Sequence, residues 1–267
     1  MTKKYFNKEY AEYWQKRVVI SLDGSRVPDE KVESFFIEKL GIESNDIVLD
    51  LGCGHGRLFP ILGSLSKNVF GIDVNEEAIK LASSNCYKSL TCASAENTKL
   101  TNDYFDKIVA WATYDVVEQK EALIEENRIL KNNGLLLITG KNKDYRDDDY
   151  NAFVAERNAK LKDFPNHFTD VYGLIDNARV FGLKVREAWG FTNRGSFGEL
   201  DCFDILTETK RPFYEFLIIF EKVGDYTREQ DFAVCDEYSD RAIEMSKSAG
   251  FDNVLDFFKY HKEQFND

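Results

Sequence analysis

This chain of 267 residues lacks several features that would assign it to a nucleic-acid-binding, membrane or secreted class. Its formal net charge is −12, so it lacks the basic surface that neutralises phosphates, and we expect no nucleic acid partner. No signal pattern and no apolar run of membrane-spanning length is present, which predicts no membrane association. The five cysteines form no CxxC pair, so we expect neither a metal site nor a disulfide framework, and a reduced, cytoplasmic location.

What the chain does have is an alternation of apolar runs and helical patterns. Strands are expected at 47–51, 69–74, 89–93, 108–112, 135–139, 184–188 and 214–220. Helices are expected at 29–40, 57–66, 76–84, 119–131 and 169–181. The strands are nearly continuous apolar runs, as in a parallel sheet covered by helices on both faces. The pattern therefore predicts an α/β fold with an open, doubly wound sheet, interrupted at 141–168 and at a polar loop, 191–212.

The first of these strands runs into a glycine turn, Asp50-x-Gly52-x-Gly54-x-Gly56. A strand, a tight glycine turn and a helix together let a ligand lie against bare backbone. A dinucleotide fingerprint would have its third glycine five residues after the first, where this chain has Arg57. The loop therefore favours a ligand other than a dinucleotide, with an ordinary glycine-rich turn as the alternative.

The order of acid and glycines resembles the first motif of class I S-adenosylmethionine-dependent methyltransferases. Asp73 ends the next strand, where an acid accepts hydrogen bonds from both ribose hydroxyls of a nucleoside. The segment 93–97 resembles the adenine-binding segment of the family, with Ser94 in place of the usual aspartate, a neutral and weaker acceptor. Segments 105–109 and 128–134 also resemble family sequences, so the resemblance covers residues 46–140.

The resemblance implies a Rossmann-like sheet of seven strands, in the order 3-2-1-4-5-7-6 with the last strand antiparallel. It also implies S-adenosylmethionine as cofactor and S-adenosylhomocysteine as product. An N-terminal helix at 7–20 would cover the cofactor, and Arg17 would meet the carboxylate of the cofactor. Tyr13, Trp14 and Tyr114 are the candidates for holding the sulfonium by cation–π attraction, and packing of the helix on the sheet is the alternative role of its aromatic residues. The other implied cofactor residues are Asp50, Gly52, Cys53, Gly54, Gly56, Asp73, Val74, Ser94, Ala95, Glu96 and Ala112.

The implied reaction is in-line displacement, in which a nucleophile attacks the sulfonium methyl group. An amine or alcohol acceptor must lose a proton, whereas a carboxylate or phosphate oxygen needs no base. The candidate catalytic residues are Tyr114, Asp115 and His167, and a surface histidine is the alternative for His167. Four basic residues in the two irregular segments suit an anionic acceptor, such as a phosphorylated or sugar-nucleotide metabolite, or are solvated loop charges: Arg146, Arg194, Lys210 and Arg211.

We therefore expect a methyltransferase domain over 1–224 with an N-terminal helical lid, acting on an oxygen or nitrogen of a small molecule. Two alternatives stay open, a non-catalytic adenosyl-ligand-binding protein and an NAD-binding oxidoreductase. Residues 225–267 hold eleven acidic and five basic residues and several aromatics, which predicts an acidic helical extension. This extension either packs on the acceptor side or forms a contact between two copies in a homodimer.

Overall fold

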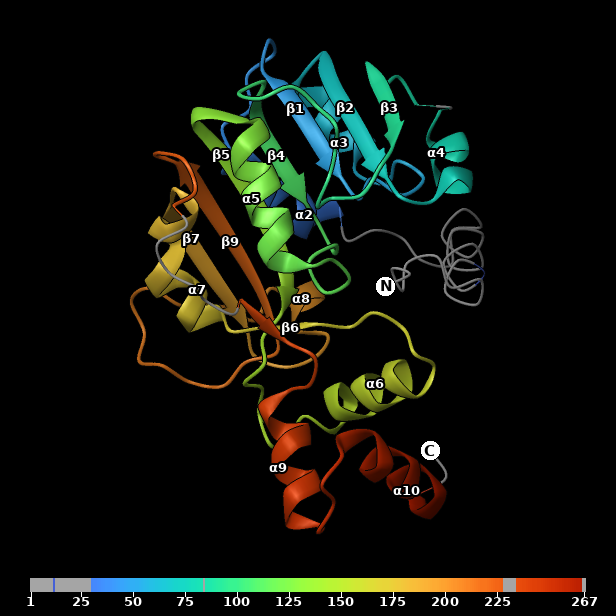
Figure 1. Cartoon of the computed structure of the whole chain (residues 1–267). Helices are drawn as coiled ribbons and strands as arrows, with labels where there is room; N and C mark the ends of the chain where they lie inside the picture. The colour runs from blue at the N-terminus through green and yellow to red at the C-terminus, as the bar shows by residue number, and fades with distance from the viewer. Residues whose placement is uncertain (1–11, 13–29, 84, 228–233, 266–267) are drawn as a thin grey trace.

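A mixed eight-stranded sheet with helices on both faces forms the centre of the computed structural model, which describes residues 12, 30–83, 85–227 and 234–265 (Figure 1). The strand order is β3-β2-β1-β4-β5-β9-β7-β8. The first five of these strands are parallel, and β9 is antiparallel to both β5 and β7. The strands span β1 (Ile47–Leu51), β2 (Asn68–Asp73), β3 (Ser89–Cys92), β4 (Phe105–Ala110), β5 (Leu130–Lys141), β7 (Leu183–Phe191), β8 (Cys202–Asp204) and β9 (Glu215–Lys222).

The expected strand order is confirmed, because β9 inserts antiparallel between β5 and β7. The expected count of seven strands is wrong. The eighth strand, β8, lies in the segment expected to be a polar loop, 191–212, and pairs antiparallel with residues 189–191 of β7. Of its three residues only Phe203 is buried, so this edge strand has too little apolar pattern to be recognised in the sequence.

Two apolar layers cover the sheet. On one face, α2 (Glu30–Glu38) and α3 (Phe59–Leu65) contribute Phe36 and Leu62 to a cluster that includes Phe191 and Leu217. On the other face, α5 (Gln119–Ile129) and α7 (Val171–Asn177) pack with Leu136 of β5 in a second cluster. The helix α4 (Glu76–Ala82) lies against β2 and β3. Both faces are therefore buried, as the continuous apolar strands predicted.

Strand β5 is longer than expected, since its ladder with β9 continues to Lys141 opposite Glu215. The helix expected at 119–131 ends at Ile129. Residue Asn133 then adopts a left-handed φ of 63° within the strand. The pairing of Leu130 with Phe105 of β4 overrides the local helical preference at this position.

The irregular segment 141–168 and the C-terminal region form a helical unit beyond the carboxyl ends of the parallel strands (Figure 1). This unit contains α6 (Tyr150–Leu161), α9 (Asp240–Ser248) and α10 (Val254–Phe265). A two-stranded ladder joins β6 (Phe168–Thr169) to β10 (Cys235–Asp236), and the ring of Phe153 contacts those of Phe257 and Phe258. The two segments thus pack together, and the boundary expected after residue 224 stays a prediction.

Two expectations fall on other parts of the chain. The predicted helix at 7–20, with Tyr13 and Arg17, lies outside the described residues. Within the described ranges, no helix combines the length and the hydropathy needed to cross a membrane.

Candidate cofactor and acceptor site

The glycine turn follows β1 directly, and its three alternate glycines all have left-handed backbone conformations. The φ angles are +77° at Gly52, +54° at Gly54 and +89° at Gly56. Residues with a Cβ rarely adopt these angles, which explains why glycine occupies every second position of the turn.

The three glycines differ in what surrounds them. A Cβ on Gly52 would overlap Oγ1 of Thr113, and a Cβ on Gly56 would overlap the side-chain amide of Asn85. A Cβ on Gly54 would meet no atom within 4 Å. Gly52 and Gly56 are therefore required by contacts inside the protein, whereas Gly54 borders open space in which a ligand can lie.

Asp73, at the end of β2, is connected to this turn. Its Oδ2 accepts a hydrogen bond of 2.9 Å from the amide of Gly54, and its Oδ1 accepts one of 2.8 Å from the amide of Asn75. Burial raises the pKa of this carboxyl, while the two amide bonds act in the opposite direction. Each oxygen retains a further acceptor position, as binding of two vicinal hydroxyl groups requires.

Asp50 and Cys53 lie beneath the turn. Asp50 is 2% exposed, accepts a 2.6 Å hydrogen bond from the hydroxyl of Tyr87, and has its pKa raised to about 7 by burial. The thiol of Cys53 is buried beside Gly71. Both side chains are buried and therefore belong to the protein interior next to the turn. No sequence pattern indicated Tyr87 as the hydrogen-bond partner of Asp50.

The segment after β3 forms a tight turn in which Ser94 bridges to Asn97. Ser94 is partly exposed, whereas Ala95 is 7% exposed and belongs to the core cluster. Oε1 of Glu96 accepts a hydrogen bond of 3.0 Å from the amide of Glu118, at the start of α5. Val74 follows β2, and its carbonyl accepts the thiol of Cys92 at 3.5 Å. Ser94 is therefore partly accessible to a ligand, and Glu96 connects this turn to α5.

The end of β4 carries backbone strain. Ala112 is exposed with a φ of +53°, and its amide donates a 2.7 Å hydrogen bond to Oγ1 of Thr139. Oγ1 of Thr113 donates to the carbonyl of Leu51 at 3.2 Å. These bonds join the ends of β1, β4 and β5, so the strained residue is held beside the glycine turn.

The structure separates the three predicted catalytic residues. Tyr114 is fully buried, and its hydroxyl donates to Glu126 of α5, away from the strand ends. Asp115 forms an ion pair of 2.6 Å with Nζ of Lys141, and its carbonyl accepts the backbone amide of His167 at 2.8 Å. Asp115 and His167 are therefore neighbours, while Tyr114 belongs to the core.

Three polar residues beside Asp115 were not predicted. Nζ of Lys141 also donates to Oδ1 of Asn166 at 2.5 Å. Glu215 lies directly opposite Lys141 in the β5–β9 ladder, and burial raises its pKa to about 7. A charged residue just after an apolar strand was a usable signal for Lys141. No sequence signal indicated Glu215. It begins strand β9, and only the antiparallel direction of β9 brings this first residue to the edge where the parallel strands end.

Three of the four basic loop residues are paired with acids. Arg146 lies 2.6 Å from Asp148, Lys210 lies 3.6 Å from Asp176, and Arg211 lies 3.3 Å from Glu208. Arg194 is exposed, and its backbone amide donates to Asp149 at 2.6 Å. The basic residues therefore do not converge on one anion-binding site.

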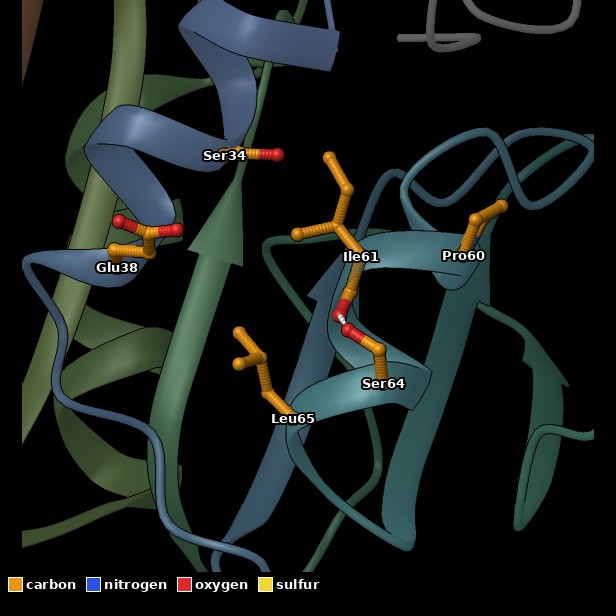
Figure 2. Close-up of a pocket in the computed structure, with 6 residues that line it drawn as sticks. All are labelled: Ser34, Glu38, Pro60, Ile61, Ser64 and Leu65. Carbon is orange, nitrogen blue, oxygen red and sulfur yellow. Dashed lines mark hydrogen bonds between the residues drawn. The ribbon is translucent and has the colours of Figure 1, made fainter.

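A shallow groove on the outer surface of α2 and α3 lies apart from this site (Figure 2). Its lining contains none of the predicted cofactor or acceptor residues. One hydrogen bond within it, from Oγ of Ser64 to the carbonyl of Ile61, is 2.7 Å long. The lining residues are Ser34, Glu38, Pro60, Ile61, Ser64 and Leu65.

Comparison with known proteins identifies the domain. Residues 49–138 match a family described as a methyltransferase domain. An uncharacterised protein of Methanocaldococcus jannaschii is 36% identical over 112 residues, covering 42% of this chain and 43% of the relative. The human mitochondrial ubiquinone biosynthesis O-methyltransferase is 35% identical over 108 residues, covering 36% of this chain and 29% of the relative. The chain thus spans less than half of either curated relative.

A solved structure extends the likeness to the fold. The methyltransferase in the complex with the Trm112 activator of Haloferax volcanii has a TM-score of 0.60 at 16% identity, covering 82% of this chain and 99% of the other. The sequence match begins inside β1 and ends inside β5, the part of the sheet that carries the glycine turn. Residues 49–138 therefore match a methyltransferase domain, and the chain shares its fold with a solved methyltransferase structure.

Proposed function

We propose that the chain is an enzyme that transfers the methyl group of S-adenosylmethionine to an oxygen or nitrogen of a small molecule. The observation that carries this proposal is the contact between Gly54 and Asp73 beside open space at the carboxyl ends of β1 and β2. Ligands of open α/β sheets bind at this edge. The relative from human mitochondria acts in ubiquinone biosynthesis as an O-methyltransferase, which supports a small-molecule acceptor.

The residues at this edge fit the cofactor. The carboxylate of Asp73 has the acceptor positions that two ribose hydroxyls need, and the open side of Gly54 leaves room for the ligand. Ser94 offers a hydroxyl for the adenine. When bound, the cofactor supplies a methyl group activated by a positively charged sulfur. The role of the protein is to hold this methyl group and the acceptor atom in line and to exclude water from the site.

For an anionic acceptor, the relevant residues are the four basic residues of the two irregular segments. Arg146, Lys210 and Arg211 are each within 4 Å of a carboxylate, which reduces their attraction for a second anion. Of the four loop residues, Arg194 is the one whose positive charge acts on Glu215 at the acceptor side. A cytoplasmic location, a homodimer and the absence of a nucleic acid partner also stay proposals; light scattering after size exclusion would test the dimer.

Isothermal titration calorimetry of the full-length protein tests the proposed function. We expect S-adenosylmethionine and S-adenosylhomocysteine to bind with micromolar affinity and NAD not to bind. Tight NAD binding would instead support the oxidoreductase alternative. Cofactor binding without product formation on a broad panel of small molecules would support the non-catalytic alternative. Failure of both adenosyl ligands to bind would remove the proposal.

A further inference from the structure

Three charged side chains from three different segments meet at the acceptor side of the sheet. Lys141 ends β5, Glu215 begins β9 opposite it, and Asp115 follows β4. Nζ of Lys141 lies 2.6 Å from Oδ2 of Asp115 and 2.5 Å from Oδ1 of Asn166. The lysine is therefore already committed to two partners, and one of them is a carboxylate.

Glu215 differs from Asp115 in having an uncommitted oxygen. Its Oε2 is buried and has no hydrogen-bond partner among the described residues. A buried carboxylate oxygen without a donor costs about 1–3 kcal/mol, more when it is charged. A ligand that donated a hydrogen bond to this oxygen would remove that cost.

We propose that Glu215 is the general base of the reaction and that the acceptor is therefore a protic nucleophile, a hydroxyl or an amine. This inference rests on the proposed function. Carboxylate and phosphate acceptors need no base and would place a second anion beside Glu215. The acceptor group is thus a hydrogen-bond donor. The ion pair with Lys141 would hold the carboxylate of Asp115 beside this group.

The charges around Glu215 suit this role. Burial raises its pKa to about 7, the range in which a carboxylate both exists at neutral pH and has a strong affinity for a proton. The positive charges of Lys141 and Arg194 lower this pKa, and the carboxylates of Asp115 and Asp149 raise it. The neighbouring Tyr214 hydroxyl has its pKa raised to about 12 by burial, so it remains protonated.

The proposed step balances in atoms and charge. A lone pair of the acceptor oxygen or nitrogen forms the bond to the methyl carbon. The carbon–sulfur bond breaks, and its electron pair stays on sulfur as S-adenosylhomocysteine leaves. The proton of the acceptor passes to Glu215, which then releases it to water. No oxidant or further co-reactant is needed.

Carbon-13 NMR of the full-length protein with S-adenosylhomocysteine tests the inference without relying on activity. The resonance of Glu215 is assigned by its loss in Glu215→Gln, and Glu221→Gln serves as a matched control on the same strand, where Glu221 pairs with Arg186. The carboxyl is titrated alone and with phenol, benzylamine or benzoate, three probes with the same ring. We expect phenol or benzylammonium to lower the pKa of Glu215 by about 1 unit, because a donor stabilises the carboxylate.

Benzoate has no proton to donate at neutral pH, and we expect it to leave the pKa unchanged or to raise it. If neither protic probe lowers the pKa of Glu215, or if benzoate lowers it, the inference is overturned. Calorimetry separates this result from the proposed function. If the unmodified protein did not bind S-adenosylmethionine, the proposed function would be contradicted. The variant Glu215→Gln should bind the cofactor with unchanged affinity, and its kcat should fall by about 100-fold or more.

Discussion

The amide of Gly54 donates a 2.9 Å hydrogen bond to Oδ2 of Asp73, although 19 positions separate the two residues. This bond ties the glycine turn after β1 to the end of β2. The same carboxylate accepts the amide of Asn75, the N-cap residue of α4. One side chain thus orients the turn, begins a helix and keeps acceptor positions for a ligand.

Asp73→Ala should weaken the binding of S-adenosylmethionine by about 1–3 kcal/mol, because charge-assisted hydrogen bonds to the ligand are lost. Calorimetry gives the dissociation constant directly. Asp176→Ala is the control, since Asp176 is exposed and its contact is an ion pair of 3.6 Å with Lys210. Equal affinities for the unmodified protein and Asp73→Ala would exclude Asp73 from the cofactor site.

Gly52→Ala and Gly54→Ala should have different consequences. Both place a Cβ at a positive φ, which costs about 1–2 kcal/mol. Only Gly52→Ala also creates an overlap with the side chain of Thr113, so it should lower Tm further and regain part of the loss in the double variant with Thr113→Ala. Gly54→Ala should instead weaken cofactor binding in a protein that remains folded. The measurements are thermal unfolding and calorimetry, and a larger loss of Tm for Gly54→Ala would contradict this assignment.

Glu126 should make the protein less stable as the pH rises. Burial raises its pKa from 4.5 to about 8, so between these values the folded protein holds a proton that the unfolded chain has released. Stability is therefore greatest below the unfolded value and falls as the pH approaches about 8. Glu126→Gln cannot ionise and should flatten this dependence.

Urea unfolding at several pH values measures this effect. The variant places an amide group beside the hydroxyl of Tyr114, which changes the free energy of unfolding by an amount that does not depend on pH. The slope of the unfolding free energy against pH is the informative quantity. An unchanged slope in Glu126→Gln would mean that Glu126 is ionised in the folded protein.

Ser239→Ala should weaken the docking of α9. Ser239 is the N-cap of this helix, where its hydroxyl accepts the amide of Ala242, and it donates to the buried carboxylate of Glu156 at 2.6 Å. Loss of an N-cap costs about 1 kcal/mol, and loss of the bond to Glu156 adds to it. Hydrogen exchange over 240–248 should accelerate, whereas Ser248→Ala, at the other end of α9, should have little effect. Equal protection in both variants would argue against this role of Ser239.

The strands of the sheet were predictable where neighbouring residues in the sequence specify both the strand and the turn that follows it. The apolar run 47–51 and the acid-glycine order after it specify a buried strand followed by a turn, and both are present. Asp73 could be placed at the end of a strand for the same reason. Strand β8 could not be predicted, because an edge strand with one buried residue pairs only after β7 is in position.

The site was predictable on the cofactor side and much less so on the acceptor side. The turn, Asp73 and Ser94 are neighbours because parallel strands bring their carboxyl ends to one edge. Tyr114 was expected beside the acceptor, yet its hydroxyl points into the core toward Glu126. A single residue after a strand can point to either face of the sheet, and only packing decides which.

The sequence alone determined the alternation of strands and helices, the glycine turn and the match of residues 49–138 to a methyltransferase domain, since these depend on residues close together in the chain. The tertiary structure decided which glycine borders open space and which acid keeps a free oxygen. Lys141 and Glu215 are 74 positions apart and become neighbours only when β9 pairs antiparallel with β5. The surroundings of Glu215 at this position, which no local pattern encodes, raise its pKa to about 7.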